Sequence, residues 1–227
     1  MKSEEFIPNV NPKENAFLSK FFILGCFIFC EKEMNADTMK RNERKKFEMK
    51  LSWNVDSSWT LFIDRDGVIN ERNFEGYILN KKDFVFKEGV LESSKSLFSK
   101  FKHVVLVTNQ QCIGKGLISL DGVREIHDYM ESCLIQNGAK IDLVLVAPEI
   151  RGAENSTRKP QPHMAILAQE IIKSIDFSKS IMVGDTDSDI QFGKNLEMKT
   201  VLIESAEKCT ILPDVEVSSL MELNKRL

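Results

Sequence analysis

The sequence predicts an α/β fold, a Rossmann-like parallel sheet with helices on both faces. Short apolar, β-branched runs alternate with longer segments whose apolar residues recur at helical spacing. This alternation implies parallel strands in one sheet that helices cover on each side. Polar clusters follow three of the runs, at the strand ends where open α/β sheets bind ligands. The 227 residues suffice for one moderate domain with a substantial core.

The first expected strand, residues 59–63, is followed directly by Asp64-Arg65-Asp66-Gly67. Side chains two apart on an extended segment point the same way, so Asp64 and Asp66 both project beyond the strand end. Gly67 permits a sharp turn after them. Two adjacent carboxylates repel each other unless a cation lies between them or one keeps its proton. Such a pair gives one site both a nucleophile and a general acid.

Two other interpretations of this acidic segment are an ordinary Asp-Gly turn and a calcium-binding loop. The turn remains open on these residues alone. A calcium loop would use Glu75 at its twelfth position, but Val68 replaces an oxygen ligand and Ile69 replaces the required glycine. The calcium loop is therefore excluded.

A first helix is expected at residues 89–101, where apolar residues form one face at helical spacing. The second strand, residues 104–108, ends in Thr108-Asn109-Gln110. A hydroxyl and successive backbone N–H groups reach this strand end, as a phosphate cradle requires. The alternative is a polar strand end without a ligand. A helix at 121–136 and a strand at 143–147 follow.

Arg158-Lys159-Pro160 precedes a third helix, residues 162–175, which Pro162 can start at its first position. One guanidinium and one ammonium then lie near a helix N-terminus, a place that attracts anions. The alternative is a solvated basic pair.

The fourth strand, residues 181–184, ends in the acidic run Asp185-Thr186-Asp187-Ser188-Asp189. Carboxylates are hard oxygen ligands suited to Mg²⁺, although acidic residues also favour helix N-termini, and a helix is expected at 187–196. A strand at 200–203 and a helix at 218–226 complete the pattern. Each polar cluster has a structural explanation alone, but their repetition favours one active site.

Two loops, residues 70–87 and 148–157, are expected to border this site. No separate cap domain is expected, because the stretch before the first helix is short and the stretch 108–158 is used up by a helix and a strand. The cleft is then open, and three aromatic residues either contact the substrate or pack the first loop onto the domain: Phe74, Tyr77 and Phe84.

From Trp59 to the C-terminus the chain resembles the haloacid dehalogenase (HAD) superfamily of phosphohydrolases. The resemblance rests on Asp64 to Asn70, on Thr108-Asn109-Gln110 with Gly114-Lys115-Gly116, and on Arg158-Lys159-Pro160. The residues of these motifs are similar to those of one branch, the heptose bisphosphate and histidinol-phosphate phosphatases. The resemblance implies Mg²⁺-dependent hydrolysis of a phosphate monoester through an aspartyl-phosphate.

The resemblance also implies roles for individual residues. Asp64 is expected to be the nucleophile, and Asp66 to protonate the leaving oxygen and then activate water. Thr108 and Lys159 would bind the transferring phosphoryl group. Asp185 would join Asp64 and the carbonyl of Asp66 around Mg²⁺. The other candidates for substrate or phosphate binding are Asn109, Lys115 and Arg158.

Three departures from the branch concern metal and substrate. Many members carry a Cys/His zinc loop before the Arg-Lys-Pro segment, but residues 147–157 contain neither residue type, so no zinc is expected. Thr186 stands where a basic residue is common, and Lys115 where arginine is usual. Asp189 is expected to support Lys159 or a water on the metal.

Composition limits the partners and the compartment. A formal charge of −3 leaves no basic excess for a nucleic-acid backbone, so the Lys and Arg residues of the site indicate a small phosphorylated substrate. The 5 cysteines are odd in number and lack metal-ligand spacing, which suits a cytoplasmic protein. The 3 histidines are too scattered to form a ligand cluster. We expect a monomer.

Residues 1–50 are expected to be an extension to the phosphatase domain, which we place at 55–227. The apolar segment 17–30 is interrupted by Lys20 and too short to span a bilayer, so no stable membrane insertion is expected. An export signal is the alternative. The segment 31–48 is charged and indicates a linker or disordered arm, and Met49 is a candidate for the true start.

Three functions compete. The first is a phosphatase for a sugar bisphosphate, with heptose 1,7-bisphosphate favoured over histidinol phosphate. The second is a phosphatase for a larger substrate, such as a nucleic-acid end or a phosphoprotein. The third is a phosphate-binding relic without activity, which the intact set of acidic residues and lysine disfavours.

Overall fold

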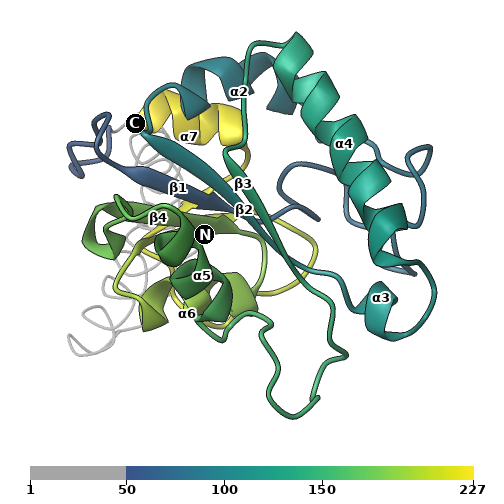
Figure 1. The fold of residues 1–227 in the computed structure, drawn as a ribbon. Helices are drawn as coiled ribbons and strands as arrows, with labels where there is room; N and C mark the ends of the chain where they lie inside the picture. Colours follow the sequence, from purple (N-terminus) through teal and green to yellow (C-terminus); the bar gives the residue numbers. More distant parts are fainter. Residues whose placement is uncertain (1–49) are drawn as a thin grey trace, which may run out of the picture. The chain divides into compact units, whose positions relative to one another are not determined.

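The fold is a six-stranded sheet with helices on both faces (Figure 1). The computed structural model of the chain describes residues 50–227. The strand order is β3-β2-β1-β4-β5-β6, and every neighbouring pair is parallel. The predicted Rossmann-like α/β fold is confirmed.

The strands are β1 (Thr60–Ile63), β2 (His103–Asn109), β3 (Leu143–Ala147), β4 (Ser180–Gly184), β5 (Lys199–Ile203) and β6 (Val215–Val217). The first five match the predicted strands. The sixth was not predicted, because three residues are too few to display a strand pattern. It extends the sheet beside β5, with Val215 opposite Val201.

The helices are α2 (Val90–Phe98), α3 (Gln111–Gly114), α4 (Leu120–Gln136), α5 (His163–Ile171), α6 (Asp187–Asn195) and α7 (Leu220–Arg226), with a 3₁₀ turn η1 at Phe177–Lys179. The short α3 was not predicted. Helices α2 and α5 end earlier than predicted, because Phe101 and Ile175 continue the apolar pattern of the sequence but lie in turns after the helices. Their N–H groups donate to the carbonyls of Phe98 and Ile172 at 3.1 and 3.0 Å.

Alternate residues of each strand face opposite helix layers. On β1, Leu61 and Ile63 lie in a core cluster with residues of α2, α4 and α7, whereas Phe62 packs with residues of α5 and α6. Figure 1 shows these two layers on opposite sides of the sheet. Burial on both faces explains why the strands are continuous apolar runs.

The loops at the carboxyl end of the sheet are simple. Between β1 and α2 the chain forms turns and two isolated bridges, Asp66–Asn70 and Asn70–Phe86. Between β3 and α5 it forms turns and bends. Within residues 50–227, therefore, no separate cap domain interrupts the fold.

The expectations for the extension lie outside the described residues, including its apolar segment, its charged arm and the start at Met49. The boundary of the phosphatase domain at 55 stays a prediction. In the described part of the chain, no helix is both long and apolar enough to cross a membrane.

Candidate active site

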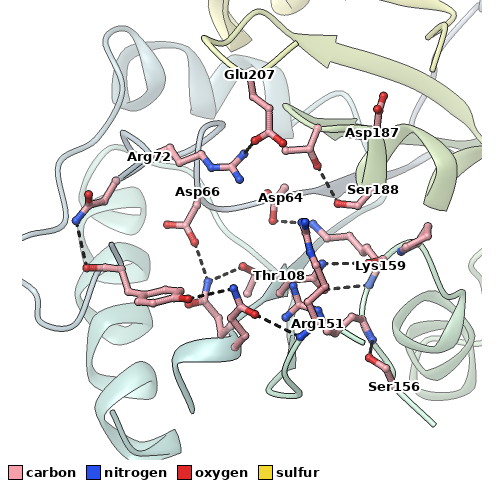
Figure 2. Close-up of a pocket in the computed structure, with 18 of the residues that line it drawn as sticks. Asp64, Asp66, Arg72, Thr108, Arg151, Ser156, Lys159, Asp187, Ser188 and Glu207 are labelled. Carbon is pink, nitrogen blue, oxygen red and sulfur yellow. Dashed lines mark hydrogen bonds and ion pairs between the residues drawn. The ribbon is translucent and has the colours of Figure 1, made fainter. Parts of the chain in front are cut away.

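The carboxyl ends of β1, β2 and β4 border a cleft of about 1160 Å³ (Figure 2). Asp64 follows β1, Thr108 ends β2, and Asp185 follows β4. Because β1 lies between β2 and β4, its end is central to the site. The predicted residues that line the cleft are Asp64, Asp66, Thr108, Asn109, Lys115, Arg158 and Lys159. Asp185 is buried beneath them.

Lys159 is the buried cation of this site. Its Nζ lies 2.7 Å from Oδ1 of Asp64 and 2.6 Å from Oδ1 of Asp189, and it donates to the carbonyl of Val107 at 2.7 Å. The two carboxylates raise the pKa of Lys159 against the lowering effect of burial, so the ammonium stays charged. The predicted support of Lys159 by Asp189 agrees with this geometry.

Three buried carboxylates, those of Asp64, Asp185 and Asp189, have oxygens within 4.8 Å of one another. Burial raises the pKa of Asp64 to about 7; Lys159 opposes this shift, and the neighbouring carboxylates add to it. Burial and the charge of Asp189 raise the pKa of Asp185 to about 6, against Arg72 and Lys159. The protein alone thus leaves negative charge incompletely compensated.

The donor set fits a hard divalent cation. Oδ1 of Asp185 is buried and has no hydrogen-bond partner among residues 50–227. Asp189 is already engaged, since its Oδ1 pairs with Lys159 and its Oδ2 accepts from the backbone N–H and the hydroxyl of Thr186 at 3.1 and 2.6 Å. Asp64 and Asp185 each use one oxygen in an ion pair, with Lys159 and Arg72, and so keep the other for a metal ion, which prefers oxygen ligands of this kind.

Two glycines permit the close approach of these segments. A Cβ on Gly67 would lie 2.1 Å from Oδ2 of Asp185, and the φ of Gly67 is +88°. A Cβ on Gly184 would lie 2.0 Å from the Cβ of Asp189. Any side chain at either position would push an acidic residue out of the site.

Asp66 lies at the edge of the cleft and is held from three sides. It accepts from Arg65, from the amide of Asn70 at 3.0 Å and from the amide of Gln110 at 2.8 Å. The same amide of Gln110 donates to the hydroxyl of Thr108 at 2.8 Å. Burial raises the pKa of Asp66, but the Arg65 charge and these hydrogen bonds outweigh it, so the pKa is lowered. The carboxylate form is favoured.

Arg72, on the loop after β1, is a site residue that was not predicted from the sequence. Its Nη1 lies 3.1 Å from Oδ2 of Asp185. The same Nη1 lies 2.8 Å from Oε2 of Glu207, the ion pair that Figure 2 shows. It thus joins the first loop to the segment after β5 and fixes one oxygen of Asp185. A single arginine on a loop carries no spacing signal that would have revealed this.

Asp187, in the acidic run after β4, does not belong to the cluster of Asp64, Asp185 and Asp189. Its carboxylate accepts from the backbone N–H groups of Thr210 and Ile211, both at 2.8 Å, and from the Thr210 hydroxyl at 2.7 Å. Cys209 also donates to it. Asp187 therefore anchors the loop after β5, and the hydrogen bond from Cys209 and the others lower its pKa.

The other predicted binding residues, Asn109, Lys115 and Arg158, line the cleft, and each makes hydrogen bonds within the protein. Asn109 clamps the backbone of Lys159, accepting from its N–H at 2.9 Å and donating to its carbonyl at 3.2 Å. Lys115 donates to the hydroxyl of Tyr77 at 2.7 Å. Arg158 donates to the carbonyl of Glu149 at 2.9 Å, a contact that helps to order the loop.

The three aromatic residues of the first loop separate into two groups. Phe74, which is 61% exposed, and Tyr77 line the cleft. Phe84 is buried and packs edge-on against Phe86 and Tyr129. Contact of Phe84 with a substrate is therefore excluded, and packing of the loop onto the domain is its role.

Comparison with known proteins places this site in a family. A family model described as HAD-hydrolase-like matches residues 156–210. A D-glycero-alpha-D-manno-heptose-1,7-bisphosphate 7-phosphatase of Mycobacterium bovis is 35% identical over 138 residues, which cover 61% of this chain and 73% of the relative. The chain belongs to the HAD superfamily, in the branch of the heptose bisphosphate phosphatases. A D-glycero-beta-D-manno-heptose-1,7-bisphosphate 7-phosphatase of Vibrio cholerae is 32% identical over 158 residues, covering 66% and 83%.

A solved structure shares the fold of this HAD phosphatase. D,D-heptose 1,7-bisphosphate phosphatase from B. bronchiseptica, complexed with magnesium and phosphate, superposes with a TM-score of 0.68 at 24% identity. The match covers 74% of this chain and 97% of that one. The structure confirms the predicted fold, and the two relatives at 35% and 32% identity confirm the predicted superfamily and phosphatase class.

The HAD phosphatase orders its loop before Arg158 through protein contacts. The hydroxyl of Thr157 donates to Oε1 of Glu149 at 2.8 Å, and the N–H of Gly114 donates to the carbonyl of Pro148 at 3.0 Å. The N–H of Arg151 donates to the side chain of Gln111 at 3.3 Å. Bonds to α3 and within the loop thus fix the position of Arg158.

Proposed function

We propose that this HAD phosphatase is a monomeric cytoplasmic enzyme that removes one phosphate group from a sugar bisphosphate, with D-glycero-D-manno-heptose 1,7-bisphosphate as the first candidate. The observation that carries the chemistry is the ion pair between Asp64 and the buried Lys159 at the floor of an open cleft. The two relatives at 35% and 32% identity support the choice of substrate.

In the first step Asp64 acts as the nucleophile. Its carboxylate oxygen forms a bond to phosphorus as the bond from phosphorus to the leaving oxygen breaks, which gives an aspartyl-phosphate. A carboxylate and a phosphoryl group repel each other, so the step requires fixed positive charge beside both. Lys159, at 2.7 Å from Asp64, supplies it, and the Thr108 hydroxyl adds a donor.

Asp66 is the acid and base of the reaction. Hydrogen bonds from Asn70, Arg65 and Gln110 favour its carboxylate, the form that accepts a proton from water in the second step. In the first step, the negative charge of an arriving phosphoryl group raises the pKa of a neighbouring carboxyl group. Asp66 then takes up a proton from solvent and gives it to the leaving oxygen. In the second step Asp66 accepts a proton from water as the water oxygen bonds to phosphorus and the bond from phosphorus to Asp64 breaks, which releases phosphate.

A magnesium ion would be held by Asp64, Asp185 and the carbonyl of Asp66. When bound, it neutralises phosphoryl oxygens and relieves the repulsion among the buried carboxylates. We expect chelator-treated enzyme to be inactive and to recover with Mg²⁺. Stoichiometric zinc retained in active, chelator-washed protein would contradict the assignment, because thiolate ligands are lacking near these carboxylates in the described structure.

Basic residues at the rim of the cleft support a substrate with a second phosphate group. Lys115, Arg151 and Arg158 all line the cleft, apart from the Lys159 that the chemistry uses. A second anion several ångströms from the reacting one would meet these cations. A monophosphate such as histidinol phosphate would bring no second anion to these cations.

Phosphate release from a matched panel tests the proposal. The panel contains both anomers of heptose 1,7-bisphosphate, the corresponding heptose monophosphates, histidinol phosphate and a nucleoside monophosphate. We expect the highest kcat/KM with one of the bisphosphates. A higher kcat/KM with histidinol phosphate would overturn the substrate assignment, and no release from any compound would overturn the reaction.

A further inference from the structure

Arg65, between the two aspartates of the site, is buried without a role in the reaction described above. It is 1% exposed and is one of the largest fully buried side chains among the described residues. A guanidinium keeps its proton at neutral pH, so its burial is costly unless its charge and its N–H donors have partners. The partners of Arg65 therefore indicate its role.

The first contact is with Asp66. Nη2 of Arg65 lies 2.9 Å from both carboxylate oxygens, and Nε donates to Oδ1 at 3.2 Å. This fork fixes the plane of the Asp66 carboxylate. Asn70 and Gln110 each donate to a single oxygen, so Arg65 is the partner that holds both.

The second contact is with His127 on α4, 62 positions away along the chain. Nη1 of Arg65 lies 3.1 Å from Nε2 of His127, which is also buried. A guanidinium only donates, so Nε2 is the acceptor and the proton of the neutral ring is on Nδ1. The imidazole thus holds Nη1, while Nε and Nη2 of the same guanidinium bind Asp66.

We propose that Arg65, braced by His127, is a positioning residue that aims the carboxyl group of Asp66 at the leaving oxygen. The inference rests on the proposed function, in which Asp66 is the acid. The described chain has no cap domain over the cleft, and the donors to this carboxyl group belong to the domain itself: Arg65, Asn70 and Gln110. Arg65 links it to β1 and α4, the rigid body of the domain.

Two aryl phosphates of similar shape test the proposal, because they differ mainly in how much protonation the leaving group needs. Phenolate requires a proton far more than p-nitrophenolate does. The parameter is kcat/KM, which reports only the steps up to departure of the leaving group. For Arg65→Met we expect a loss of about 10-fold or more with phenyl phosphate and less than about 3-fold with p-nitrophenyl phosphate.

Variants of His127 test the brace without touching Asp66. His127→Leu removes the acceptor and should show the same leaving-group dependence more weakly, whereas His127→Gln keeps an acceptor oxygen and should restore the wild-type ratio. Arg226→Met is the matched control. It removes another buried arginine, which pairs with Glu222 and does not line the cleft, and should leave the ratio unchanged.

The outcomes separate the inference from the proposed function. Asp66→Asn should show the strongest leaving-group dependence. If it loses both activities equally, the acid role of Asp66 fails, and the inference with it. If Asp66→Asn discriminates but Arg65→Met and His127→Leu lose both activities equally or not at all, Arg65 is only structural. Should Arg65→Met not fold, His127→Leu against His127→Gln decides.

Discussion

At the scale of single residues, the site depends on which charges are paired and which are left for ligands. Lys159 pairs with Asp64 and Asp189, whereas one oxygen of Asp185 has no partner in the part of the chain that the structure describes. Arg158 uses Nη1 on the carbonyl of Glu149 and keeps donors that can face the cleft, which it lines. A bidentate guanidinium suits a phosphate group, so Arg158 is the first candidate for the distal phosphate.

Replacement of Arg158 tests that role. We expect Arg158→Ala to raise KM for a sugar bisphosphate about 10-fold or more, and KM for a monophosphate much less, because only the bisphosphate loses a charge-assisted contact. Steady-state kinetics on both substrates measure this. Arg124→Ala, which removes an exposed arginine paired with Asp121 on α4, is the control. Equal increases on both substrates would assign Arg158 to ordering the loop.

The sequence predicted the acidic and basic residues of the site better than their supporting contacts. Asp64, Asp66, Asp185 and Lys159 follow from strand ends and from the family resemblance, because spacing and motif survive in the sequence. Arg65 and Arg72 act through contacts to residues brought close by folding, and such contacts leave no pattern. The contact of Asp187 with Thr210 is of the same kind, because its place in an acidic run does not indicate which residues its carboxylate faces.

At the scale of elements, α4 is tied to the end of β1 through His127. Burial and the Arg65 charge lower the pKa of His127 to about 3, with Asp66 acting in the opposite direction. The neutral ring is therefore the form compatible with the folded state. The elements themselves were predictable from apolar periodicity, whereas β6 and α3 are too short to show a period.

His127 should make stability depend on pH. In the unfolded chain histidine titrates near its ordinary pKa of about 6.5, so between there and about 3 the unfolded state binds more protons than the folded state. Stability should therefore fall as pH drops through this range and be unaffected by this group above it. Urea unfolding at pH about 7 and about 5 should show a larger loss for wild type than for His127→Gln. Identical losses would contradict the assignment.

At the scale of the whole molecule, residues from Lys50 to Leu227 form one compact unit. Its beginning is tied to its end, because the N–H of Leu51 donates to the carbonyl of Arg226 at 2.7 Å. Trp53 and Val55 pack against the core that α2, α4 and α7 cover. The cleft and every contact used in the proposed mechanism lie within this unit.

A chain that begins at Met49 should therefore retain the function. We expect its Tm to stay within about 2 °C of that of the full chain and its kcat/KM to be nearly unchanged, since no contact of the proposed mechanism is removed. Thermal unfolding and phosphate release measure both quantities. An insoluble or inactive truncated protein would show that the first 48 residues support the domain.

The most direct test of the account is whether phosphate passes through Asp64. Enzyme with Mg²⁺ is mixed with heptose 1,7-bisphosphate that carries radiolabelled phosphate groups, quenched in acid during the first turnover, and assayed for labelled protein. We predict a transient label that neutral hydroxylamine removes, as expected of an acyl phosphate, and neither label nor turnover in Asp64→Asn. Turnover by wild type without labelled protein, or turnover that persists in Asp64→Asn, would contradict the covalent mechanism.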